Sequence, residues 1–284
     1  MSVLDATPCL LGEGPLWHPE RGALFWFDIL ARKMMCHSAD GVQSWVFDEN
    51  HSAAGWVDHD TLLIASETGL WRFDLLSGDR TLVVALEADN AITRSNDGRA
   101  DPWGGFWIGT MGKKAERGAG AIYRYFCGEL RKLVPDVSIS NAICFAPDRV
   151  CAYYTDTPTR RIMRQPLDND GWPSGPAQVF VDLRKAGQNP DGAVTDAQGN
   201  LWVALWGAAR VSCFDPQGHH LRDVPLPALQ PTCPAFGGPD LCDLIVTSAA
   251  NGLDADPDTH TPANGATYCF AGITQGLPEP KVIL

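Results

Sequence analysis

The sequence predicts an all-β protein, a six-bladed β-propeller with four-stranded antiparallel blades, and we expect residues 1–284 to form a single domain of this kind. Three observations support this prediction. A short apolar and aromatic segment recurs six times along the chain, each copy is followed by a second strand-like segment ending in turn residues, and no stretch has a convincing helical period. Strand repeats of this length are typical of propeller blades.

The six apolar segments begin 38 to 50 residues apart, with a mean spacing of 44. They are rich in Val, Ile, Phe, Tyr and Trp and are bounded by Gly, Pro and Asp, which favours strands over helices. In chain order they are LFWFDI from residue 24, LLIASE from 62, FWIGTM from 106, CAYYTD from 151, LWVALW from 201 and LIVTSA from 244.

The second strand-like segments complete each repeat. Five follow their apolar segment closely, and the sixth follows a longer insertion: residues 32–41, 69–79, 121–130, 160–171, 209–218 and 266–276. A closed ring hides strand edges that could otherwise pair with other chains. The segments left over at the two ends of the chain are therefore expected to complete one shared blade.

The composition narrows the possible partners. The chain has 22 Lys and Arg against 34 Asp and Glu, a net charge of −12, which argues against nucleic acid or an anionic membrane as partner. No run approaches the ~20 apolar residues of a membrane span. The nine cysteines form no C-x-x-C pair or zinc-like cluster, so we expect buried, unpaired thiols in a cytoplasmic protein.

Polar residues recur at one offset from the apolar segments. Ten residues before the second to sixth segments, and eleven before the first, are Ser52, Asn96, Asn141, Asp191, Pro234 and Glu13. Each of them taken alone is explained by a turn, because Asn and Asp favour turns. Equivalent positions in a propeller converge on the ring axis, however, so the repeated offset indicates a site.

The chemistry of that site follows from its charges. Glu13 and Asp191 would bring two carboxylates together, with no basic residue at the same offset. Such a pair must share a proton or bind a cation, and the amide oxygen of Asn141 adds a third hard ligand. This donor set favours Ca²⁺, Mg²⁺ or Mn²⁺, while Zn²⁺ and Fe²⁺ also accept carboxylates.

Four motifs resemble the SMP-30/gluconolactonase family of six-bladed propeller lactonases: GEGPLW, RSNDGRADPWGGFWIGTM, ISNAICFAPD and NPDGAVTDAQGNLWVALWGAARVSCFDP. Their order and separation also match. The resemblance implies metal-dependent hydrolysis of a sugar-acid lactone, such as a glucono-, xylono-, arabinono- or galactonolactone. It implies one divalent metal ion held by Glu13, Asn141 and Asp191, substrate contacts from Arg94 and Asn96, and a catalytic role for Asp191.

One pair of residues departs from the mammalian members, which have an acidic pair after the GTM strand. Here the matching residues are Lys113 and Lys114. Either they belong to a solvated loop, as surface charge usually does, or one of them contacts a lactone bearing an extra carboxylate. We take Lys114 as the candidate substrate-binding residue.

The proposed chemistry has three requirements: a polarised ester carbonyl, a delivered water and a protonated leaving oxygen. Asp191 is expected to act as general base, and Arg94 to hold substrate hydroxyls or the developing oxyanion. No G-x-S-x-G motif supports a serine mechanism. A propeller phosphotriesterase-like or other ester hydrolase, or a non-catalytic binding propeller, are the alternative functions.

Overall fold

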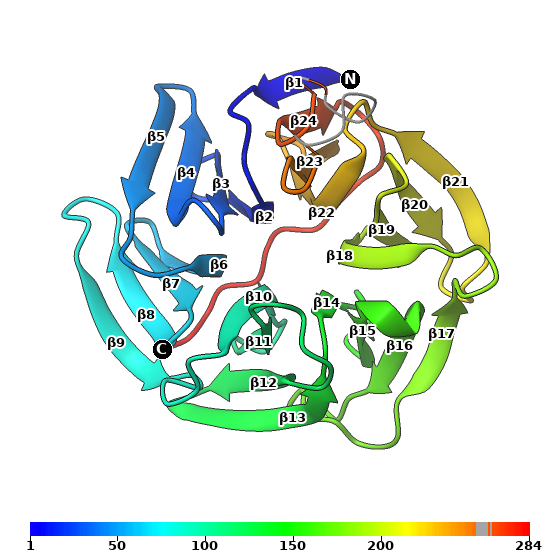
Figure 1. Ribbon diagram of the computed structural model, residues 1–284, viewed down its shortest axis with the longest axis horizontal. Coiled ribbons are helices and arrows are strands. Elements are labelled where there is room, and N and C mark those ends of the chain that lie inside the picture. Colours follow the sequence, from blue (N-terminus) through cyan, green and yellow to red (C-terminus); the bar gives the residue numbers. More distant parts are fainter. Residues whose placement is uncertain (254–260, 262) are drawn as a thin grey trace.

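The computed structural model describes residues 1–253, 261 and 263–284. In this part of the chain, six four-stranded antiparallel sheets lie in a ring as the blades of a propeller, which confirms the predicted fold (Figure 1). The strands of the first three blades are β2 (Gly12–His18), β3 (Ala23–Asp28), β4 (Lys33–Ser38) and β5 (Gly41–Val46); β6 (His51–Asp58), β7 (Thr61–Ser66), β8 (Gly69–Asp74) and β9 (Arg80–Ala85); β10 (Thr93–Ala100), β11 (Phe106–Gly112), β12 (Gly120–Phe126) and β13 (Glu129–Val137).

The other three blades follow the same pattern. Their strands are β14 (Ser140–Phe145), β15 (Cys151–Asp156), β16 (Arg161–Pro166) and β17 (Gln178–Asp182); β18 (Asn189–Thr195), β19 (Leu201–Trp206), β20 (Arg210–Phe214) and β21 (His220–Pro225); β22 (Gln230–Gly237), β23 (Asp243–Ala249), β24 (Thr267–Phe270) and β1 (Ser2–Asp5). Each predicted apolar segment is the second strand of its blade. The described residues contain one short 3₁₀ helix, η1 (Thr157–Thr159), and no helix able to cross a bilayer.

The ring is closed by a blade that both ends of the chain share. Strand β1 pairs antiparallel with β24, with Ser2 opposite Cys269 and Val3 opposite Tyr268. The N-terminal segment thus completes the last blade, as expected from the sequence, whereas the residues left over at the other end, 277–284, form no strand. Strand β1 is the outer strand of that blade, so the first residues of the chain pair with the last repeat.

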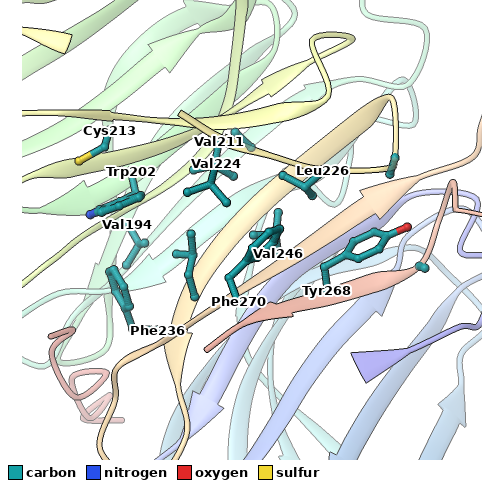
Figure 2. Packing of buried hydrophobic residues seen from close by; sticks show 14 residues of the cluster. Val194, Trp202, Val211, Cys213, Val224, Leu226, Phe236, Val246, Tyr268 and Phe270 are labelled. Carbon is teal, nitrogen blue, oxygen red and sulfur yellow. The ribbon is translucent and has the colours of Figure 1, made fainter. Parts of the chain in front are cut away.

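The hydrophobic core consists of six clusters of buried residues, each of which lies between two neighbouring blades. Figure 2 shows the cluster between the fifth and sixth blades, where Trp202 of β19 and Phe236 of β22 meet edge to face with ring centroids 6.2 Å apart. Truncating a buried Trp of this kind costs about 3–5 kcal/mol. The clusters fix the angles between blades, and thus the positions of the six inner strands around the ring axis.

Most of the cysteines are buried, as predicted. All nine are free thiols, and six of them are buried. Burial raises the pKa of the Cys9 thiol to about 12, so it packs as a small neutral side chain. The other three are Cys127, which is exposed at a turn, and Cys242 and Cys269, which are half-buried.

Candidate metal centre and active site

The site begins with a β-bulge in every inner strand. Strands β2, β6, β10, β14, β18 and β22 all shift register against the second strand of their blade near the beginning of the inner strand, and β6 has a second shift near its end. A bulge leaves residues unpaired and re-aims their side chains. Asn96 and Asp191 lie in their bulges, whereas Glu13 and Asn141 are the last paired residues before theirs.

This geometry refines the register counted from the sequence. Glu13 and Asn141 are each followed by a residue with left-handed backbone, Gly14 at φ 57° and Ala142 at φ 56°. Their side chains therefore reach the site from the paired residue just before the bulge, whereas those of Asn96 and Asp191 reach it from inside the bulge. Pro234 does not hold an equivalent position, because it pairs with Val246. The bulge of β22 instead contains Thr232 and Cys233.

All six predicted site residues line one cavity of about 600 Å³: Glu13, Arg94, Asn96, Lys114, Asn141 and Asp191. They come from four different blades, so only the closed ring brings them together. Leu11, Leu30 and Trp206 add apolar surface to the same cavity. A cavity with apolar walls and a few convergent polar groups is typical of a small-molecule site.

A chain of hydrogen bonds orders the polar side of this cavity. Arg94 donates from Nη1 to Oδ1 of Asn96 at 2.7 Å, and Asn96 donates from Nδ2 to Oδ1 of Asn141 at 3.0 Å. Asn141 in turn donates from Nδ2 to Oγ1 of Thr157 at 2.9 Å. The Thr157 hydroxyl donates to the carbonyl of Pro190 at 2.8 Å, which directly precedes Asp191.

Thr157 is a contributor that the sequence-based prediction missed. It is the first residue of η1, and its hydroxyl links Asn141 to the strand that carries Asp191. A single Thr in a turn gives no signal of such a role, because Ser and Thr are common in turns for local reasons alone.

The carboxylates of the site are buried without an ion pair in the described part of the chain. Glu13 is 4% exposed, Asp191 5% and Asp97 3%. Burial, reinforced by the charge of Asp97, raises the pKa of Glu13 to about 8. Burial and the charge of Glu13 raise the pKa of Asp191, and burial raises the pKa of Asp97 to about 6.

Asp97 follows Asn96 in the same bulge and was not predicted as part of the site. Its Oδ2 accepts a hydrogen bond from the backbone N–H of Ile143 at 2.7 Å. This contact spans from β10 to β14 and holds the bulge that contains Ala142, next to Asn141. The carboxylate therefore supports the position of Asn141 and adds negative potential behind the site.

The donor set fits a divalent cation. Two buried carboxylates are costly as ions unless a positive charge offsets them. Arg94 lowers the pKa of both Glu13 and Asp191 less than burial raises it, and neither carboxylate forms an ion pair with any residue that the structure describes. Within the described residues, no group of three or more His, Cys, Asp or Glu side chains is placed to hold a metal. A cation here would thus need the amide oxygen of Asn141 as its third protein ligand.

The two lysines differ in their surroundings. Lys113 forms an ion pair with Glu67, which compensates its charge. Lys114 has no ion pair in the described ranges, and its backbone N–H donates to Oε2 of Glu116 at 3.0 Å, so its loop is ordered. Both line the cavity, and Lys114 is the one with an uncompensated charge.

His51, next to Ser52 of β6, is fully buried and points away from the site. Its Nδ1 lies 3.1 Å from the carbonyl of Glu49 and its Nε2 lies 3.2 Å from Nη1 of Arg80. Burial lowers its pKa to about 4, so the ring is neutral and structural. Ser52 itself donates to Oγ of Ser95 at 2.8 Å.

Known proteins resemble this chain over nearly all of its length. A family model described as the SMP-30/gluconolactonase/LRE-like region matches residues 11–250. A putative sugar lactone lactonase of Rhizobium meliloti is 38% identical over 98% of this chain and 95% of the relative. A 6-deoxy-6-sulfogluconolactonase of Pseudomonas putida is 34% identical over 96% and 95%. The solved structure of a calcium-binding protein, regucalcin, from Agrobacterium tumefaciens is 44% identical, with a TM-score of 0.96 over 99% of this chain and 97% of that one.

Proposed function

The chain belongs to the SMP-30/gluconolactonase/LRE-like family, and from this premise we propose that it hydrolyses the ring ester of a sugar-acid lactone with the help of one divalent cation. Relatives named as lactonases are carboxylic ester hydrolases, and the chain is an enzyme of that class. One observation carries the proposal: two buried, unpaired carboxylates and an ordered amide converge beside Arg94 in one cavity.

Glu13, Asn141 and Asp191 would hold the cation. When bound there, a divalent cation supplies Lewis-acid polarisation of an ester carbonyl and lowers the pKa of bound water. All three ligands are hard oxygens, which suits Ca²⁺, Mg²⁺ or Mn²⁺. The calcium-binding relative supports Ca²⁺ as the first ion to test.

Asp191 would act as the general base. A carboxylate at the edge of the cavity can take the proton of the attacking water and return it to the departing ring oxygen, so its ordinary protonation state is restored in each turnover. Burial raises the pKa of Asp191 in the metal-free chain, so the bound cation would be what keeps this carboxylate ionised and able to accept a proton.

Arg94 and Asn96 would bind the substrate. Arg94 uses Nη1 for the Ser95 carbonyl at 2.8 Å and for Asn96, which leaves Nε and Nη2 without a hydrogen bond in the described part of the chain. Those donors are free for sugar hydroxyls or for the oxygen that becomes negative during attack. Burial of Arg94 among acidic residues strengthens such contacts, because little water competes.

The free charge of Lys114 favours lactones that bear a second acidic group. With a cation bound to Glu13 and Asp191, the remaining cavity charges would be those of Arg94, Lys114 and the compensated Lys113. A carboxylate or sulfonate far from the ring ester would complement Lys114. The relative named 6-deoxy-6-sulfogluconolactonase supports this substrate class.

We further propose that the closed ring acts as one domain, residues 1–284, in a reducing compartment such as the cytoplasm. Pairing of β1 with β24 supports the first point. Nine unpaired cysteines support the second, since oxidising compartments favour disulfides.

A proton-release assay tests the proposed function. The chelated protein is measured on neutral aldonolactones and on lactones with an extra carboxylate or sulfonate, before and after separate addition of Ca²⁺, Mg²⁺, Mn²⁺ and Zn²⁺. We expect lactone turnover that chelation abolishes and one ion restores best. Turnover of aryl esters or phosphotriesters but of no lactone would instead favour the other hydrolase class, and no turnover at all would favour a binding propeller.

A further inference from the structure

The last part of the chain crosses the ring. Residues 273–284, here termed the crossing segment, follow β24 and pass through the centre of the ring to the opposite side (Figure 1). Backbone hydrogen bonds attach the segment to four blades: Ala197 and Leu241 contact its first half, and Trp56 and Gly104 contact its second half. The Trp56 indole also donates from Nε1 to the Glu279 carbonyl at 2.7 Å.

Arg99 of β10 is the point where this segment meets the inner strands. Its guanidinium pairs through Nη1 with the Glu279 carboxylate, and the two side chains are only 11% and 8% exposed. Its Nη2 reaches the carbonyl oxygens of Ala193 in β18 at 3.3 Å and of Pro234 in β22 at 3.4 Å. One side chain therefore connects the third blade, the fifth blade, the sixth blade and the crossing segment.

The contacts of Arg99 bear directly on the bulges of the site. Ala193 and Pro234 are the first paired residues after the bulges of β18 and β22. Ala193 lies two residues beyond Asp191. Arg94, at the other end of β10, lines the site cavity, whereas Arg99 lines a second cavity of about 540 Å³ formed with the crossing segment.

A contact across the ring axis can set the separation of inner strands that belong to different blades. Hydrogen-bond ladders hold strands within one blade, but among the described strands no ladder joins inner strands on opposite sides of the axis. Their separation depends on blade packing and on side chains that span the axis. A planar guanidinium with several donors is suited to this task, because one group can satisfy several acceptors in a fixed geometry.

We propose that the Arg99–Glu279 pair is a cross-axis tie that sets the position of the β18 bulge, and hence of Asp191, which makes Arg99 a positioning residue for the reaction. Glu279 holds the guanidinium in place and neutralises it, and Arg99 then fixes the two carbonyls beyond the bulges. This inference rests on the proposed function, because its effect is expressed through the ligand set of Glu13, Asn141 and Asp191.

Two variants test the tie. Glu279→Gln keeps the shape of the side chain and removes its charge, while Arg99→Lys keeps the charge and loses the fork that reaches both carbonyls. The control is Glu129→Gln, which removes the ion pair between Glu129 and Arg131. That pair lies at the surface, with the Glu129 side chain 55% exposed and the Arg131 side chain 50% exposed. Ca²⁺ and Mn²⁺ affinities are measured by calorimetry on the chelated full-length proteins, well below their unfolding temperatures, together with kcat and KM on the best lactone.

We expect both tie variants to bind the cation about 10-fold or more weakly and to lose kcat by a similar factor, with a smaller change in KM, as does the loss of a contact that helps to position metal ligands. The control should match the wild type. A purely structural role would lower the unfolding temperature and leave cation affinity and kcat of the folded protein unchanged, and that result would overturn the proposal.

The two proposals fail in different ways. If the wild-type chain takes up no cation and hydrolyses no lactone, the proposed function fails and the tie has no ligand set to position. If the wild type does both and the folded tie variants equal it, only the tie is wrong. Should Glu279→Gln fail to fold, Arg99→Lys gives the same comparison, since it keeps the buried charge pair.

Discussion

Asn96 donates a hydrogen bond to the amide oxygen of Asn141 across 45 residues of sequence, with 3.0 Å between Nδ2 and Oδ1. Because Asn141 also donates to Thr157, both ends of its amide are fixed and its oxygen faces the cavity side shared with Asn96. A ligand oriented in this way before the cation arrives loses little freedom on binding, which favours affinity.

Replacement of Asp191 by Asn tests its role as base. The amide keeps an oxygen ligand but cannot accept the water proton, so we expect kcat to fall by roughly 100-fold or more while the protein stays folded. Circular dichroism and steady-state kinetics with saturating cation measure both quantities. Wild-type turnover by Asp191→Asn would contradict the assignment.

Loss of either other ligand should weaken the cation first. Glu13→Gln and Asn141→Ala are expected to raise the cation concentration needed for half-maximal activity by more than about 10-fold, with partial rescue at high cation. Ser52→Ala is the matched control, since Ser52 lies in the equivalent bulge of β6 and does not line the cavity. Failure of excess cation to rescue both variants would point to a folding role instead.

Cation affinity should depend on pH with a defined sign. Burial and the charge of Asp97 raise the pKa of Glu13 in the metal-free chain to about 8, so below that pH the cation must displace a proton. The apparent Kd should therefore fall as the pH rises toward 8, by up to about tenfold per pH unit for each proton displaced. Calorimetry at several pH values between 6 and 9 measures the slope, and a flat profile below pH 8 would be the contrary result.

The lysines should separate acidic from neutral lactones. Lys114→Ala is expected to raise KM about 5-fold for a lactone with a second acidic group, consistent with an exposed charge contact of about 1 kcal/mol, and to leave neutral lactones unchanged. The effect should shrink at high salt. Lys113→Ala serves as comparison, because Glu67 already compensates Lys113. Equal KM values for the two lactone classes in wild type and Lys114→Ala would remove the proposed contact.

Gly14 offers a test of the bulge itself. Its φ is 57°, and a Cβ there would lie 2.3 Å from the Ser52 carbonyl oxygen, whereas Gly22 has φ 58° and open space around it. Gly22→Ala should lower the free energy of unfolding by about 1–2 kcal/mol, because Ala is strained in left-handed backbone. Gly14→Ala should lower it clearly more, because its Cβ would also clash with the Ser52 carbonyl. Unfolding free energies from urea titration compare them, and equal losses would mean that the close approach of β2 and β6 is not rigid.

Much of the fold could be predicted because its signal is repeated. The six apolar segments are the second strands of six blades, since a buried strand needs a nearly continuous run of large apolar side chains. The shared blade of β1 and β24 followed from closure of the ring. The course of residues 273–284 across the axis could not be predicted, because this segment belongs to no repeat.

The sequence was sufficient to predict which residues converge at the site. It was not sufficient to predict their positions in the bulges or the contacts that hold them. Asn141 and Asp191 lie ten residues, and Glu13 eleven residues, before their apolar segments. Which of them lies inside its bulge depends on the left-handed backbone at Gly14 and Ala142. Asp97 and Thr157 were missed because their importance lies in single contacts with another blade. Pro234 was misplaced because β23 begins at a different distance from its bulge.

Anomalous diffraction from crystals soaked in Mn²⁺ locates the cation without relying on activity. We expect one strong peak on the ring axis, within about 2.0–2.5 Å of oxygen atoms from Glu13, Asn141 and Asp191, and its loss in Glu13→Gln crystals. A peak elsewhere, or no peak among these three side chains at a cation concentration that supports turnover, would contradict the proposed cation site.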